Sequence, residues 1–296
     1  MDALPAELVV QIVEFACTDG GHTACALRAT SKYLCRASEP FRFYTVALRN
    51  PKQSPCFLEA FKDSSQLARA SARHLFIAIY KENAQVGNLI LQSISRTIET
   101  LTCVLREPDD KPLRRTTFPR LAALTLVYHE YTARLFSRLG PFPDTPTLPR
   151  LRDLHIAHRR PALVFRAHVS LDWFARRAGG ALVRARVSGV ELDDAWVLML
   201  QDILARRPVR YLPPVPAGLA RYVVELCHVP DAQMVEELRA LQRWAKQEGV
   251  VEFLLSPWRS RAHMTPGDWE AEWLAVQRGA VRPRVERLDD DADEQA

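Results

Sequence analysis

A short leucine-bearing pattern that recurs along the chain limits its possible folds more than any other feature. Residues 119–126 read Pro-Arg-Leu-Ala-Ala-Leu-Thr-Leu, and residues 149–156 read Pro-Arg-Leu-Arg-Asp-Leu-His-Ile, 30 positions later. Looser copies occur at 72–77 and 98–103, and weaker ones at 182–187 and 250–255. A chain with such copies is expected to stack similar units against one another. The anchor leucines of the first four copies are Leu75, Leu101, Leu124 and Leu154, with steps of 26, 23 and 30 residues.

Each copy predicts a short β-strand, because apolar residues alternate along it and β-branched residues flank it. The segments between the copies have the spacing of helices. Strands that alternate with helices favour parallel pairing with crossover connections, and therefore an α/β fold. The predicted helices are 57–72, 85–98, 131–139, 171–178, 193–205 and 232–247.

The period of the copies resembles that of leucine-rich repeats, which is ~20–29 residues. This resemblance implies an irregular strand-helix solenoid over residues 56–277. The asparagine that such repeats place after the second strand leucine is replaced here by Tyr80, Arg106, His129 and Arg159, so irregular curvature is expected. A doubly wound α/β domain would show the same alternation and stays open. A last helix from Thr265, with Trp269, Trp273 and Val276 on one face, is expected to close the end of the stack.

The first residues of the chain form a different pattern. Leu4, Leu8, Ile12 and Phe15 recur every three or four residues and so share one face of a short helix, which Asp19-Gly20-Gly21 ends. A second stripe contains Leu27, Thr30, Leu34 and Ala37 and ends at Pro40. Helices this short bury too little surface to be stable alone. They must pack on the rest of the chain, on a partner, or on both.

Residues 1–48 resemble an F-box of the fungal type. They contain Leu-Pro-x-Glu-Leu-x-x-x-Ile from Leu4, a Ser31-Lys32 pair, and a closing Phe43-to-Leu48 segment, although Leu34 stands where the family often has Trp. The resemblance implies docking to a Skp-family adaptor and, through it, to the cullin and RING subunits of an SCF-type ubiquitin ligase. The adaptor-binding residues that it implies are Leu4, Pro5, Glu7, Leu8, Ile12, Leu27, Lys32 and Leu34.

Together the two resemblances imply a substrate-recognition subunit that is not an enzyme and that binds a protein target through its repeats. Strand residues pointing away from the helices would face that target. The alternative is a repeat scaffold for protein–protein interaction without a ligase connection, whose N-terminal helices would be buried on its own first strand. The substrate-facing candidates are Phe76, Ala78, Thr102, Val104, Thr125, Val127, His155 and Ala157.

No catalytic, cofactor or metal motif is found. With 11 glycines the chain has neither a G-x-G-x-x-G nor a P-loop, and no G-x-S-x-G. His155 and His158 would point to opposite faces of a strand, which weighs against a metal site. The six cysteines have no disulfide framework, which predicts reduced thiols and an intracellular location, in the cytoplasm or nucleus. No apolar run approaches the ~18 residues of a membrane span.

The charge pattern leaves one further alternative open. The chain has 40 basic and 35 acidic residues, and five of the acids lie in residues 289–294, within a charged tail (281–296) expected to be disordered. The arginines between 159 and 210 could form a stripe that binds nucleic-acid phosphates. The absence of interleaved aromatic residues and the position of the arginines at helix ends weigh against that function.

Overall fold

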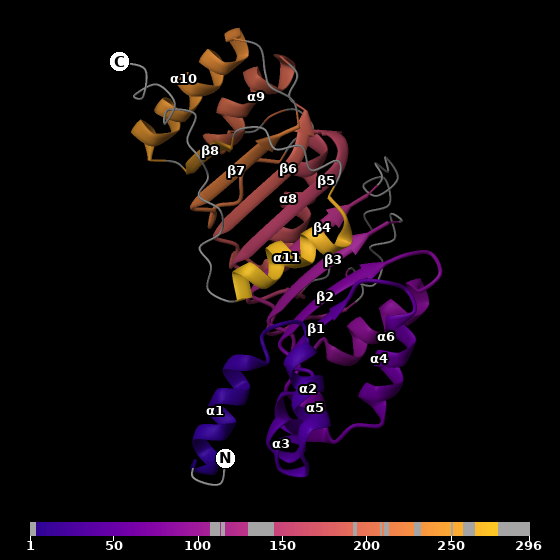
Figure 1. Cartoon of the computed structure of the whole chain (residues 1–296). Helices are drawn as coiled ribbons and strands as arrows, with labels where there is room; N and C mark the ends of the chain where they lie inside the picture. The colour runs from indigo at the N-terminus through magenta and orange to yellow at the C-terminus, as the bar shows by residue number, and fades with distance from the viewer. Residues whose placement is uncertain are drawn as a thin grey trace. The chain divides into compact units, whose positions relative to one another are not determined.

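The structure, a computed structural model, describes residues 4–106, 113, 116–129, 145–191, 194–207, 209, 213–227, 232–249, 251–256 and 264–277. It is an α/β protein with one eight-stranded parallel sheet, whose strands follow the chain in the order β1 to β8 (Figure 1). The strands are β1 (Thr45–Leu48), β2 (His74–Ile79), β3 (Thr100–Leu105), β4 (Ala123–Tyr128), β5 (Asp153–Leu163), β6 (Arg184–Glu191), β7 (Arg221–Leu226) and β8 (Glu252–Ser256).

Helices alternate with these strands, as the repeat pattern predicts. None of the described helices is long and apolar enough to cross a membrane. The helices are α1 (Ala6–Ala16), α2 (His22–Thr30), α3 (Lys32–Ser38), the 3-10 helix η1 (Glu39–Phe41), α4 (Gln53–Lys62), α5 (Gln66–Ala70), α6 (Ala84–Ile94), α8 (Val164–Ala178), α9 (Asp194–Leu204), α10 (Ala232–Glu248) and α11 (Pro266–Gln277).

The chain divides into two compact units. Unit 1 contains residues 1–106, 111–121 and 265–282, and therefore β1 to β3 and the N-terminal helices. Unit 2 contains residues 107–110, 122–264 and 283–296, and therefore β4 to β8.

The anchor leucines of the repeat pattern form the core of each unit. In unit 1, Leu75 lies opposite Leu101 in the parallel register, and in unit 2 Leu124 lies opposite Leu154. All four side chains are buried. The regular pairing explains the spacing in the sequence, because each copy contributes one strand with a leucine on the face that the helices cover.

Several predicted elements differ in extent. The helix predicted over 57–72 is two helices, α4 and α5, separated where Ser65 caps α5 by accepting a hydrogen bond from the Ala68 backbone N–H. Helix α8 begins at Val164 rather than at 171, and β7 was not predicted at all. The helix predicted over 131–139 and the tail 281–296 lie outside the described residues.

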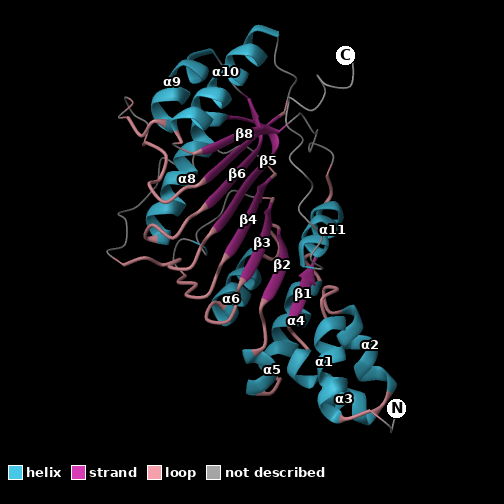
Figure 2. Cartoon of the chain, turned by 90° about the vertical axis from the view of Figure 1, so that its left-hand side faces the viewer, coloured by secondary structure: helices cyan, strands magenta, loops and turns pink. Residues whose placement is uncertain are grey.

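The terminal helix α11 was predicted to close the end of the stack. It lies instead on a face of the sheet in unit 1 (Figure 2). The Trp273 ring packs on Phe76 of β2 with 5.9 Å between centroids, and Gln277 Nε2 donates to Thr100 Oγ1 at 3.1 Å. Helix α6 covers the opposite face, because Gly87 contacts Ile77 and Ile79. The sheet of unit 1 is thus covered on both faces.

Candidate partner-binding face on the N-terminal helices

Helix α1 has two apolar faces, and only one of them is buried. Leu4, Leu8, Ile12 and Phe15, which we call the α1 stripe, are 46%, 45%, 56% and 83% exposed. Val9 and Val13, on the other side of the helix, are 5% and 2% exposed. Residues three or four positions apart share a helix face, so the spacing in the sequence separates these two sets. The α1 stripe is therefore a continuous apolar surface with no covering element in the described part of unit 1.

The buried face of α1 fixes the helix on a small core with α2 and α3. Val9, Val13, Cys17, Ala24 and Leu34 form this core, and Leu27, Ala37 and Phe41 pack against it. Burial, with smaller contributions from Asp19 and Cys25, raises the pKa of the Cys17 thiol to about 11. Cys17 is thus a protonated packing residue rather than a nucleophile.

Local hydrogen bonds define where these helices begin and end. Asp19 accepts from the backbone N–H of Thr23 at 2.9 Å, and Gly20 and Gly21 adopt positive φ angles, which a turn this tight requires. Ser31 Oγ accepts from the Leu34 N–H at 3.1 Å and caps α3. Both features agree with the stop-and-turn signal and with the Ser31-Lys32 pair in the sequence.

Six of the eight predicted adaptor-binding residues are exposed, and the other two, Leu27 and Leu34, lie against or in the helical core. Leu4, Leu8 and Ile12 belong to the α1 stripe, and Pro5, Glu7 and Lys32 are exposed around it or on α3. Leu34 is 8% exposed and lies in the helical core, because the α3 face that carries it turns toward α1. Leu27 is half-buried against the same core. Phe15 and Tyr33, 83% and 48% exposed, were not among the predicted site residues.

The predicted substrate-facing residues do not form an accessible surface. Four of them, Phe76, Ala78, Thr102 and Val104, are buried in unit 1, where α11 lies on the face that carries Phe76. In unit 2, Val127, His155 and Ala157 are also buried, and Thr125 is partly exposed. Strand alternation identifies the face on which a residue lies but not what covers that face.

Sequence reasoning missed a buried polar network in unit 2. Ser188 Oγ donates to Glu225 Oε2 at 2.7 Å and lies 2.8 Å from His155 Nε2. Arg186 also donates to Glu225 Oε2, at 2.7 Å, so the buried carboxylate has a counter-ion. Ser188 and Glu225 are fully buried, which keeps this serine from reaching a substrate. The signal in the sequence was the polar run Arg184, Arg186 and Ser188 at alternating positions of β6.

His155 and His158 lie on opposite faces of β5. His155 joins the polar network, whereas the His158 ring stacks on Tyr128 at 5.5 Å, and burial lowers the pKa of His158 to about 4. No group of three or more metal-binding side chains occurs among the residues that the structure describes. His155 thus belongs to the polar network on one face, and His158 packs on Tyr128 on the other.

Several of the arginines that suggested a phosphate-binding stripe have partners within unit 2. Arg184 pairs with Asp153, with an Nη2–Oδ2 distance of 2.7 Å, and Arg176 with Asp172 at 2.8 Å. The guanidinium of Arg177 lies 4.5 Å from the Trp173 ring centroid and is buried. Each of these three arginines thus contacts a carboxylate or an aromatic ring of the chain itself.

Comparisons with known proteins identify no relative, since no family model, no curated protein and no solved structure matches the chain. The functional argument therefore depends on the α1 stripe and its surroundings.

Proposed function

We propose that the chain is the substrate-recognition subunit of an SCF-type cullin-RING ubiquitin ligase and that residues 1–48 bind a Skp-family adaptor. The observation that supports this function is the exposure of the α1 stripe beside a helical core that is already complete. Leu8, Ile12 and Phe15 on successive turns of α1, with Leu4 just before the helix, make the kind of apolar surface that marks an interaction site.

The size of the exposed side chains fits a partner interface. Burying a leucine, isoleucine or phenylalanine side chain completely contributes about 1.5–3 kcal/mol, so the half-exposed residues of the α1 stripe would each contribute about 1 kcal/mol on docking. Leu4, Leu8, Ile12 and Phe15 would form the apolar centre of the contact. Glu7 and Lys32 would be rim charges that favour one orientation of the adaptor over others.

The rest of the chain would hold the target protein as an irregular leucine-rich-repeat-like solenoid. The strand order supports this architecture, because it follows the chain from β1 to β8 without the reversal that a doubly wound sheet requires. The ubiquitin transfer itself would be performed by the RING subunit and its conjugating enzyme. The contribution of this chain would be to raise the effective concentration of the target beside that enzyme.

A scaffold without a ligase connection predicted N-terminal helices buried on the first strand. The exposed α1 stripe argues against that arrangement. A direct test is the binding of the full chain to a purified Skp-type adaptor by isothermal titration and co-elution. The Leu8→Asp/Ile12→Asp variant should bind at least about 100-fold more weakly, because docking would then bury two carboxylates.

Two control variants separate loss of binding from loss of folding. Leu67→Asp/Leu89→Asp makes the same chemical change at exposed positions on α5 and α6 and should bind like the wild type. Val9→Asp/Val13→Asp places charges in the helical core and should melt α1 to α3. A folded wild-type chain that does not bind the adaptor, or a stripe variant that binds as well as the α5/α6 control, would refute the proposed function.

A further inference from the structure

The sheet of unit 2 ends at β8, and the outer edge of this strand has no partner strand in the described part of the chain. The Glu252 N–H donates to the Ala220 carbonyl at 2.9 Å, so the backbone groups of Glu252 point toward β7. Successive residues of a strand point their backbone groups in opposite directions, and those of Val251 and Phe253 therefore point to the open edge. Such an edge is a template for another extended chain.

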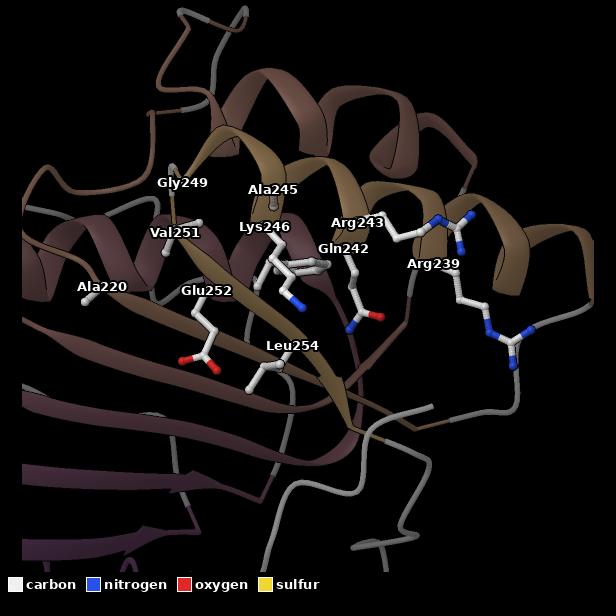
Figure 3. Close-up of a pocket in the computed structure, with 11 residues that line it drawn as sticks. Ala220, Arg239, Gln242, Arg243, Ala245, Lys246, Gly249, Val251, Glu252 and Leu254 are labelled. Carbon is white, nitrogen blue, oxygen red and sulfur yellow. The ribbon is translucent and has the colours of Figure 1, made fainter. Parts of the chain in front are cut away.

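A cavity of about 680 Å³ lies beside this edge, between β8 and α10 (Figure 3). Arg239, Gln242, Arg243 and Lys246 line it from α10, at spacings that put them on neighbouring positions of the helix surface. Gln242 and Lys246 extend from α10 toward β8 in Figure 3. Phe253 and Leu254 contribute apolar surface from the strand. The cavity thus combines an unpaired backbone edge with polar and apolar side-chain contacts.

The charge of the cavity is positive. Arg239, Arg243 and Lys246 are cationic, and Arg243 and Lys246 are exposed. Arg239 is paired with Glu236 at 2.7 Å, and the acidic side chain of the lining, Glu252, is paired with Arg221 at 2.6 Å, so the positive charge comes from Arg243 and Lys246. An extended chain bound at this edge would find cations on its helix-facing side and Leu254 on the other.

We propose that the open edge of β8 and the cationic surface of α10 bind an extended acidic segment of a partner protein, which adds to the sheet as a ninth strand. Its backbone pairs with Val251 and Phe253. Its side chains alternate, with carboxylates toward α10 and apolar groups toward Leu254. This site is independent of the proposed adaptor contact, because the two surfaces lie in different units and share no residue.

The acidic tail of the chain itself fits this site less well. Residues 289–294 read Asp-Asp-Asp-Ala-Asp-Glu and contain no β-branched or aromatic residue. Such a sequence is depleted in strand formers, and it lacks the alternating apolar side chains that would pack on Leu254. A segment with alternating acidic and β-branched residues fits both sides of the edge.

The test uses the full chain and a fluorescent peptide of alternating Val and Glu, measured by anisotropy. We expect saturable binding that weakens with salt, and at least 10-fold weaker binding of a peptide with one central Pro, which cannot pair with the edge. Binding should fall at least 10-fold in the Arg243→Glu/Lys246→Glu variant. This variant should instead bind a second peptide, in which Val alternates with Lys. The control Lys52→Glu/Lys62→Glu makes the same charge change at exposed positions of unit 1 and should change nothing.

Three results would overturn the assignment. Equal binding of the Pro peptide would exclude strand pairing. Equal binding by the α10 variant and the unit 1 control would exclude the cationic surface. If replacing the five acidic residues of 289–294 by Asn and Gln strengthened peptide binding at least 10-fold, the occupant would be the chain's own tail rather than a partner. Circular dichroism of each variant shows whether its fold is intact.

Discussion

We expect removal of the Arg49 side chain to destabilise unit 1, because it leaves a buried carboxylate without its counter-ion. Arg49 follows β1, and Glu270 lies on α11, 221 positions later. Arg49 donates to Glu270 Oε1 at 2.8 Å and pairs with Oε2 through Nε. The Glu270 side chain is 2% exposed, whereas that of Arg49 is 46% exposed. The ion pair thus links α11 to the end of β1, with Arg49 on the solvent-exposed side of the contact.

The expected loss of unfolding free energy follows from this difference in exposure between Glu270 and Arg49. Leaving one member of a buried ion pair uncompensated costs about 3–5 kcal/mol. Water can enter where the half-exposed arginine lay, so we expect Arg49→Met to lower the free energy of unfolding by about 2 kcal/mol. The double variant Arg49→Met/Glu270→Gln no longer buries a charge and should cost about 1 kcal/mol or less. Glu270→Gln leaves only the half-exposed Arg49 charge unpaired and should cost about 1 kcal/mol or less, so the coupling between the two positions should be about 1–2 kcal/mol.

Urea denaturation of the wild type, both single variants and the double variant, followed by circular dichroism, measures this coupling. Arg69→Met, an exposed position on α5, is the matched control and should change the free energy of unfolding by less than about 0.5 kcal/mol. The reasoning would be refuted if Arg49→Met behaved like this control, or if the double variant were no more stable than Arg49→Met.

Two further predictions concern unit 2 and the buried histidines. Gly189→Ala should lower the free energy of unfolding in urea by at least about 3 kcal/mol, because φ is +73° and the new Cβ would lie 2.0 Å from the His158 carbonyl oxygen. Gly180→Ala, with φ +90° and nothing within 4 Å of the new Cβ, should lower it by about 1 kcal/mol. Equal costs would contradict the clash. Burial lowers the pKa of His74 and of His158 to about 4, below the 6.5 of an unfolded histidine, so the unfolded chain binds more protons between pH 6.5 and 4. The free energy of unfolding from urea denaturation should therefore fall as pH drops through this window, by up to about 3 kcal/mol per histidine. His158→Phe should reduce the slope; a flat profile would contradict this.

The sequence alone was sufficient for the features that depend on local periodicity. Leu75, Leu101, Leu124 and Leu154 identified four strands and their parallel alignment, because each buries its leucine against the helix that follows or precedes it. The α1 stripe was identified in the same way. Its exposure could not be predicted, because it depends on which face of α1 is buried. Val9 and Val13 form the buried face, since they pack in one core with Leu34.

Features that depend on distant pairs were out of reach of the sequence. Strand β7 was missed because its run lacks the anchor pattern, and its buried Glu225 is tolerated only through Arg186 and Ser188 of the neighbouring strand. The position of α11 was missed for a similar reason. Its contacts with Arg49 and Phe76 join residues about 200 positions apart, which no local periodicity encodes.

The position of α11 restricts where the target protein that we propose could bind unit 1. Trp269 and Trp273 are 2% and 6% exposed, and a buried tryptophan covers about 150–250 Å². At about 25 cal/mol per Å², uncovering both would cost roughly 10 kcal/mol, which is comparable to the stability of a whole domain. A target that displaced α11 to reach Phe76 would have to offset this cost before it gained any affinity. Target recognition is therefore expected at surfaces that are open in the folded chain, such as the edge of β8, and not at the strand face of unit 1.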